Sequence, residues 1–545
     1  MDLAHRGLRP QGSPVHHPQS SDDDHGRHPL RGHRGEPLAR HGEPDPHCSV
    51  LREHRRGQGA LGRPAHVHGH RQQPHSHRDQ GGRHQRDPHA HHQPRRMSAG
   101  PLPADLHDWI EATTGGSVVA AHRHLAGASR QAWSVDVTLD DAPLALFVLR
   151  DNLSGTGGSS RDAAVLRALS PTAVPVPKVH ADDPDLRSVL LERVDGRSDF
   201  PEVDREDERE PTARDLMVVT AALHALDPRT LAIEHLGAPG DPSDHARQQL
   251  DKVDAVAAML GDTIAPLFTF ALGWLRRSLP QGVERSSLVH SDMGPGNFLA
   301  RAGRVTAVLD WEVAHWGDAM EDLAAIAVRD MATPVGHLPA RFADYAAASG
   351  TVVDLGRVAW YRVLVLTRNA MLIGLGLSRD DPAVDRAQLT MFRILLMRAG
   401  ALSLCDAIGV PRPVEAPLAE CPTTDDIRLA THARRDQHDV VAPAIADSFA
   451  AQRAYGGEMV LGYLEHKLRF GADYHAREMD DLAGVIGHQP LDELAGWRTL
   501  RDRCGDASLE RAHAAFFGRH LLRRGMIAAP LLGPLAERLP QRLEA

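Results

Sequence analysis

The stretch of sequence that decides the fold is LVHSDMGPGNFLARAGRVTAVLDWEVAHWGDAMEDLA, residues 288–324. A short apolar segment leads into Asp292 and a loop rich in glycine and proline that ends at Asn297, and a hairpin then carries the chain to Asp310. Phosphoryl transfer requires a carboxylate near the acceptor hydroxyl and oxygen ligands for Mg²⁺. These three side chains are of the required types, and a loop and a hairpin can bring them together.

Each of these residues taken alone has an ordinary structural explanation, because Asp, Asn, Gly and Pro are common in turns. Their occurrence together and in this order favours a phosphoryl-transfer site. We expect the neighbouring His290 to be a buried hydrogen-bonding residue rather than a proton carrier. We expect Asp318 and Asp322 to cap and anchor a helix over residues 320–329.

The residues before this stretch predict two lobes. Residues 118–149 alternate as strands with a turn at Asp140 and Asp141, a helix is expected over 160–169, and a further strand over 185–194. A long helical region follows. This order predicts an α+β, protein-kinase-like two-lobe fold with a β-rich N-terminal lobe and a helical C-terminal lobe.

Residues 115–400 resemble the aminoglycoside phosphotransferase and choline kinase-like enzymes. HSDMGPGN matches the HxDxxxxN catalytic loop of that family, and LDWE matches its metal-binding strand end. The resemblance implies a small-molecule kinase that uses ATP and Mg²⁺. It implies that Asp292 is the catalytic base, that Asn297 and Asp310 bind Mg²⁺, and that Glu312 supports the metal shell.

The resemblance also assigns the nucleotide-binding residues. LAGASRQAW, residues 125–133, corresponds to the loop that covers the phosphates, with Gly127 and Ser129 as the contacts. The family places a lysine on the next strand, where this chain has Arg150, which is either the phosphate-gripping cation or a solvated residue at the strand end. Asp162 corresponds to the acidic residue that pairs with that cation.

The adenine and acceptor sites are less specific in sequence. Residues 190–196 resemble the hinge between the lobes, where the main chain of Glu192 to Val194 is expected to meet adenine. The acidic run over 203–210 either attracts a cationic acceptor or is a solvated face. The combination of GASRQAW, VLR and PVPKV resembles the branch fused to acyl-CoA dehydrogenases, which implies a hydroxyacyl-CoA or another metabolite as acceptor rather than an antibiotic. The alternative is a non-catalytic nucleotide-binding module that recruits a partner.

The first 96 residues have a different composition from the rest of the chain. They contain 18 of the 35 histidines and no Phe, Trp, Tyr or Lys, so we expect a disordered tail. The interpretation we favour is that translation starts at Met97. Two weaker alternatives are metal binding by the histidines and nucleic-acid binding by a basic arm.

The 545 residues are 42% hydrophobic and carry a formal net charge of −10. With four cysteines and no run of about 18 apolar residues, we expect a cytoplasmic protein without a membrane or nucleic-acid partner.

Composition and pattern divide the chain into four predicted segments. The proline-rich stretch over 410–422 is typical of a linker, and a helical region without a catalytic motif follows it. We expect Gly456 and Gly457 to interrupt the first long helix of that region. The helices of the region could form the interface of a homodimer. The predicted segments are a tail (1–96), a nucleotide-binding N-terminal lobe (97–196), a catalytic and acceptor-binding C-terminal lobe (197–412) and a helical accessory domain (413–545).

Overall fold

The computed structural model describes residues 102–124, 130–152, 158–198, 200, 206–378 and 384–544. The predictions for the N-terminal tail, for Gly127 and for Ser129 lie outside these residues. The description below therefore concerns the two predicted lobes and the helices that follow them.

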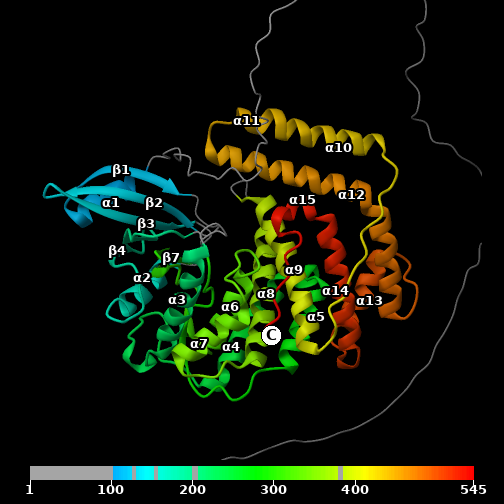
Figure 1. Ribbon diagram of the computed structural model, residues 1–545, viewed down its shortest axis with the longest axis horizontal. Coiled ribbons are helices and arrows are strands. Elements are labelled where there is room, and N and C mark those ends of the chain that lie inside the picture. Colours follow the sequence, from blue (N-terminus) through cyan, green and yellow to red (C-terminus); the bar gives the residue numbers. More distant parts are fainter. Residues whose placement is uncertain are drawn as a thin grey trace, which may run out of the picture. The chain divides into compact units, whose positions relative to one another are not determined.

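The N-terminal lobe contains an antiparallel sheet of five strands in the order β1-β2-β3-β5-β4 (Figure 1). The predicted turn between β2 and β3 is confirmed. Asp140 and Asp141 both have positive φ, 50° and 62°, as a two-residue hairpin turn with right-handed strand twist requires. The strands are β1 (Ser117–His124), β2 (Arg130–Leu139), β3 (Ala142–Asp151), β4 (Val179–Asp183) and β5 (Ser188–Glu192).

The two faces of this sheet have different neighbours, because successive side chains of a strand point to opposite faces. On one face, Leu146 and Val148 of β3 pack with Leu106 of α1 (Ala104–Thr114). On the other face, Phe147 and Leu149 pack against the large core that includes α2 (Gly158–Leu169) and the helical lobe. Alternate residues of β3 therefore face opposite sides: Leu146 and Val148 face α1, and Phe147 and Leu149 face α2 and the helical lobe.

The C-terminal lobe is helical, as predicted, and carries two small two-stranded sheets. The helix predicted over 320–329 is α6, and its bounds match the prediction. The strands are β6 (Ser287–Val289), β7 (Phe298–Arg301), β8 (Arg304–Val308) and β9 (His315–Gly317). The helices are α3 (Glu206–Ala225), α4 (His245–Leu260), α5 (Pro266–Arg277), α6 (Met320–Arg329), α7 (Leu338–Ser349), α8 (Leu355–Leu377) and α9 (Arg386–Ile408).

Helix α8 is long and apolar enough to cross a membrane by length and composition alone. In its most apolar 18 residues, 61% are buried inside the protein, against neighbours that include α6 and α9. Arg362 lies on this helix with 1% of its side chain exposed, and it donates to the carbonyl oxygen of Gln541 at 2.8 Å. These contacts identify α8 as a core helix of the lobe.

The helices after the predicted linker share a core with the helical lobe. Phe516 and Phe517 of α14 belong to the same buried cluster as Phe270 of α5 and Leu404 of α9. In Figure 1, α10 and α12 lie side by side. The elements are α10 (Asp425–Asp436), the π-helix η5 (Gln437–Val441), α11 (Ala442–Ala444), α12 (Ser448–Ile486), α13 (Glu493–Arg503), α14 (Glu510–Ile527) and α15 (Ala529–Leu532). Short 3₁₀ helices are η2 (Pro228–Thr230), η3 (Pro242–Asp244), η4 (Gly261–Thr263), η6 (Ala507–Leu509) and η7 (Gly533–Leu535).

The prediction that Gly456 and Gly457 interrupt a helix is wrong. Helix α12 runs through both residues for 39 residues. Its glycines permit close approach instead: a Cβ at Gly456 would lie 3.2 Å from the Cβ of Ala387, and one at Gly462 would lie 2.8 Å from the Cβ of Pro530. Close packing against α9 and α15 thus explains why glycine, whose intrinsic helix propensity is low, occurs inside α12.

We expect Gly462→Ala to destabilise the protein by about 1–3 kcal/mol, because the new methyl group overlaps Pro530 and either helix must shift. The matched variant Gly471→Ala should gain about 0.5–1 kcal/mol, because a Cβ there meets no atom within 4 Å. Urea unfolding of both variants measures the difference. Equal effects of the two substitutions would show that α12 does not contact α15 as described.

Candidate active site

The loop after β6 is anchored by Asp322, from the first turn of α6. The backbone N–H groups of His290 and Ser291 donate to the Asp322 carboxylate at 3.0 and 2.7 Å, and His224 Nε2 lies 3.0 Å from it. Ser291 has a φ of 68°, so these bonds hold a backbone conformation that is rare for a residue other than glycine. Asp322 thus fixes the loop that carries Asp292, and these bonds go to the loop rather than to the start of α6, where capping was expected.

Two further expectations about this loop are confirmed. His290 is fully buried and has a partner for both ring nitrogens: Nε2 lies 2.8 Å from the carbonyl oxygen of Leu309, and Nδ1 accepts from the Asp292 N–H at 3.2 Å. Asp318 accepts from the Met320 N–H at 3.1 Å, at the first residue of α6, and it also pairs with Arg357. Both residues therefore have structural roles beside the site.

The Asp292 carboxylate is held by two side chains. Asn297 Nδ2 donates to its Oδ2 at 2.9 Å, and Arg329 donates through Nε to Oδ1 at 2.9 Å and through Nη2 to Oδ2. Burial would raise the pKa of Asp292, but the hydrogen bond and charge of Arg329 outweigh burial, and the pKa lies below its usual value. About a third of the side chain, 34%, is exposed. Asp292 is therefore an ionised and oriented carboxylate that is partly open to solvent.

Glu321, the second residue of α6, also holds the loop that carries Asp292, through Ser291. Its carboxylate accepts from Ser291 Oγ at 2.6 Å and lies 3.2 Å from His315 Nε2 and 3.5 Å from Arg368 Nη1. Burial would raise the pKa of Glu321, but His315, Arg368 and Ser291 lower it to about 2. Because the folded-state pKa is depressed, the stabilisation is present above the unfolded pKa and is lost as the pH falls towards 2.

We expect Glu321→Gln to lower the free energy of unfolding by about 3 kcal/mol at pH 7, because an ionised partner of a buried network is removed. The difference from the wild type should shrink between about pH 4.5 and pH 2, where the wild-type carboxylate takes up its proton. Urea unfolding at pH 7 and pH 3.5 measures both effects. The control Glu493→Gln breaks an exposed pair with His475 and should change stability by less than about 1 kcal/mol. A difference between the wild type and Glu321→Gln that does not depend on pH would contradict this account.

Four carboxylates surround the guanidinium of Arg130, the first residue of β2. Its nitrogens lie 2.9 Å from Asp162, 3.2 Å from Glu312, 3.3 Å from Asp151 and 3.4 Å from Asp310. The Arg130 side chain is 6% exposed, and the surrounding carboxylates raise its pKa despite burial. This arrangement joins two strands of the N-terminal sheet, α2 and the segment after β8.

The predicted pair between Asp162 and Arg150 is wrong. Asp162 is buried on α2, pairs with Arg130, and accepts from the Trp311 N–H at 2.7 Å. Arg150 pairs with Asp105 of α1 and donates through Nε to the carbonyl oxygen of Leu186 at 3.3 Å. Arg150 lies on the α1 side of the sheet because it has the same parity on β3 as Leu146 and Val148.

Asp310 and Glu312 are the exposed part of this cluster. Asp310 has a φ of 67° and 38% of its side chain is exposed, yet its Oδ1 is buried without a hydrogen-bond partner. Burial and the neighbouring Asp310 raise the pKa of Glu312 to about 7. Unfavourable negative charge therefore accumulates at this point, and an additional cation would relieve it.

The chemistry of these groups fits Mg²⁺. Asp310 Oδ1, which has an ion-pair contact with Arg130 but no hydrogen bond, and the amide oxygen of Asn297 are hard oxygen ligands of the kind that Mg²⁺ takes. Leu309 donates its N–H to the carbonyl oxygen of Asn297 at 2.8 Å, which ties the two ligand-bearing segments together. Within the described ranges, no group of three His, Cys, Asp or Glu side chains is already arranged to hold a metal ion.

The predicted hinge lies where the two lobes meet along the chain. Glu192 ends β5, and its N–H donates to the carbonyl oxygen of Lys178 at 2.8 Å. Beyond Val194, Thr306 Oγ1 donates to the carbonyl oxygen of Asp195 at 2.9 Å, and Arg197 pairs with the backbone of Ala300. The contact of Glu192 and Val194 with adenine stays a prediction.

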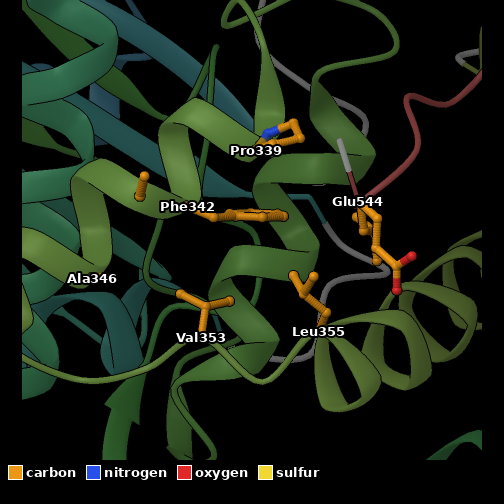
Figure 2. A pocket seen from close by; sticks show the side chains of 8 residues that line it. Pro339, Phe342, Ala346, Val353, Leu355 and Glu544 are labelled. Atoms are coloured by element: carbon orange, nitrogen blue, oxygen red, sulfur yellow. The ribbon is translucent and has the colours of Figure 1, made fainter.

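Two surface hollows lie elsewhere. Figure 2 shows the first, about 320 Å³, where Pro339 and Phe342 of α7 and Leu355 of α8 face Glu544 near the C-terminus. The second, about 410 Å³, is lined by residues that include Asp227 and Arg285. Neither hollow includes a residue of the candidate site.

Sequence reasoning missed Arg130, Asp151, Glu321, Arg329 and Arg368. One signal was available for Arg329: it lies seven residues after Asp322 on the predicted helix, and therefore on the same helical face. The contact between Arg130 and Asp151 follows from a cross-strand register that the sequence alone does not fix.

Comparison with known proteins finds similarity over part of the chain. Residues 122–361 match the model of the phosphotransferase enzyme family. Acyl-CoA dehydrogenase family member 11 from Gallus gallus is 29% identical over 177 residues, which are 30% of this chain and 22% of that protein. Hygromycin-B 4-O-kinase from Escherichia coli is 27% identical over 197 residues, 33% of this chain and 55% of the relative. The chain thus spans about a fifth of the first relative and about half of the second.

Solved structures with a similar fold include a thermostable mutant of aminoglycoside phosphotransferase APH(4)-Ia in ternary complex with AMP-PNP and hygromycin B. It is 21% identical and covers 55% of this chain and 99% of its own, with a TM-score of 0.41. Macrolide 2'-phosphotransferase MphH from Brachybacterium faecium is 19% identical and covers 57% and 99%, with a TM-score of 0.39. Taken with the two lobes and the loop of Asp292, the family match identifies a kinase-like phosphotransferase domain. The chain carries a domain of the phosphotransferase enzyme family in residues 122–361.

Proposed function

We propose that this protein is an ATP- and Mg²⁺-dependent phosphotransferase that phosphorylates a hydroxyl group of a small molecule. The observation that carries the proposal is the Asp292 carboxylate, which is ionised, partly exposed and oriented by Asn297 and Arg329. The γ-phosphoryl group would pass directly to the acceptor oxygen, the hydroxyl proton would go to Asp292, and ADP would leave.

The other described residues have defined roles in this proposal. Asn297 and Asp310 would hold Mg²⁺, which offsets the charge of the phosphates when it is bound. Asp322 and Glu321 keep the loop of Asp292 in place through the N–H groups and hydroxyl that they accept from. The segment from Glu192 to Val194 would contact adenine through its main chain.

For the acceptor we favour a hydroxyacyl-CoA or another metabolite over an antibiotic. Two of the relatives are acyl-CoA dehydrogenase family members, whereas a third is a kinase of hygromycin B. In the described part of the acidic run, Glu210 pairs with Arg341 and Arg214, so its charge is already offset. This pairing weakens the argument for a cationic acceptor.

The proposed enzyme acts in the cytoplasm on a small-molecule acceptor, without a nucleic-acid or membrane partner. It forms a homodimer through its C-terminal helices. Leu429 of α10 and Leu464 and Leu468 of α12 support this interface, because they expose 70%, 46% and 43% of their surface to solvent.

The test is ADP release by the full chain with ATP and Mg²⁺, against a panel of hydroxyacyl-CoAs, hygromycin B, other aminoglycosides and choline. We expect turnover with one acceptor class, which Asp292→Asn lowers by about 10²- to 10⁴-fold. Binding of ATP without turnover of any acceptor by a well-folded protein would instead favour a nucleotide-binding module that recruits a partner.

A further inference from the structure

We propose that Arg130 on β2, and not Arg150 on β3, is the cation that binds the phosphates of the nucleotide. This inference rests on the proposed function, since it names the residue that performs one step of it. It assigns phosphate binding to β2, whereas the resemblance to the aminoglycoside phosphotransferase family places the cation on β3.

The first observation is the parity of β3. The residue of β3 that faces the candidate site is Asp151, whereas Arg150 faces α1 and is already paired with Asp105. Asp151 accepts from the N–H and Oγ of Ser159 at 3.0 and 2.8 Å and so caps the start of α2. Asp151 is negatively charged and cannot bind a phosphate directly, so the cation that binds the nucleotide phosphates must come from an element other than β3.

The second observation is the partner of Asp162. Arg130 lies opposite Asp151 in the β2–β3 register, and its Nη1 lies 2.9 Å from Asp162 Oδ2. The same nitrogen lies 3.4 Å from Asp310, the predicted metal ligand. Arg130 thus lies between the acid of α2 and Asp310, the residue after the hairpin that would hold Mg²⁺.

The third observation is unused hydrogen-bonding capacity. Nε and Nη2 of Arg130 are buried and have no hydrogen-bond partner of good geometry, although carboxylates lie within ion-pair distance. A buried donor without an acceptor is costly. A phosphate oxygen would supply the acceptor, and a guanidinium offers a planar fork that fits it.

Charge balance adds a condition. Four carboxylates surround one guanidinium, which leaves an excess of negative charge when all four are ionised. An anionic phosphate chain will therefore bind at Arg130 only when a divalent cation accompanies it. We expect tight ATP binding to require Mg²⁺, and the contribution of Arg130 to be seen in its presence.

The test measures nucleotide affinity rather than turnover. The full chain and its variants are titrated with ATP and with adenosine by calorimetry, in the presence of Mg²⁺. We expect Arg130→Met to weaken ATP binding by about 10- to 100-fold and to change adenosine binding by less than about twofold. Arg150→Met should bind ATP as the wild type does, as should Arg167→Met, which removes the exposed pair of Arg167 with Asp182 on the same lobe.

A second variant covers loss of folding, because Arg130→Met leaves its carboxylates without a partner. Arg130→Lys keeps the charge and loses the fork, and its ATP affinity should lie between those of the wild type and the Met variant. The inference is overturned if Arg130→Lys binds ATP like the wild type and Arg130→Met, where it folds, does so too. It is also overturned if Arg150→Met is the variant that loses ATP binding. A wild-type protein that binds no ATP would refute the proposed function itself.

Discussion

Asp292→Asn should lower kcat by about 10²- to 10⁴-fold and leave the affinity for ATP within about threefold of the wild type. Asparagine keeps the shape of the side chain, so Asn297 and the loop backbone retain their positions. It removes the negative charge that orients the acceptor hydroxyl and takes up its proton. Initial rates of ADP release, together with calorimetric titration with ATP, separate the two effects.

The same substitution has a structural cost that must be measured beside the rate. Arg329 donates two hydrogen bonds to the carboxylate, and the amide keeps at most one acceptor for them. We expect a loss of about 1–3 kcal/mol in unfolding free energy. Asp254→Asn breaks a surface pair with Arg276 and serves as the control, with wild-type kcat expected. A kcat within tenfold of the wild type in Asp292→Asn would remove this residue from the chemistry.

Asp310→Asn should abolish the dependence of ATP affinity on Mg²⁺ and lower kcat by about 10³-fold or more, because an anionic metal ligand becomes a neutral one. Stability should move in the opposite direction. Asp310 is one of four carboxylates around Arg130, and it raises the pKa of Glu312 by repulsion. In the absence of metal and nucleotide, removing its charge should leave the unfolding temperature unchanged or raise it.

The combination of a lost activity and an undiminished stability distinguishes a metal ligand from a structural residue. Titration with ATP at a series of Mg²⁺ concentrations and a thermal unfolding curve of the ligand-free protein measure both. A marked fall in the unfolding temperature of Asp310→Asn would show that the residue serves the turn, where its φ is 67°.

The fold could be predicted from the sequence where a pattern is local. The period-two alternation, the Asp140-Asp141 turn and the helix over 320–329 all follow from neighbouring residues, and the structure confirms them. The helix-breaking role given to Gly456 and Gly457 failed because the contacts that hold α12 come from residues 387 and 530, which are distant in the sequence. Propensity was outweighed there by tertiary packing.

The site shows the same division. The residues of one contiguous motif, Asp292 and Asn297, contact each other as a loop motif requires. The cation of the cluster was assigned to the wrong strand, since the sequence gives no direct measure of which face of β3 turns towards α2. A shift of one residue along a strand moves a side chain to the other face. Arg130 could be found only after the register with Asp151 was known.

The cluster around Arg130 also bears on movement of the lobes. Arg130 belongs to the sheet and Asp162 to α2, whereas Asp310, Trp311 and Glu312 follow β8 in the other lobe. Separation of the lobes would have to break these ion pairs and the hydrogen bond from the Trp311 N–H. These contacts therefore couple the orientation of the two lobes to the same side chains that surround Arg130.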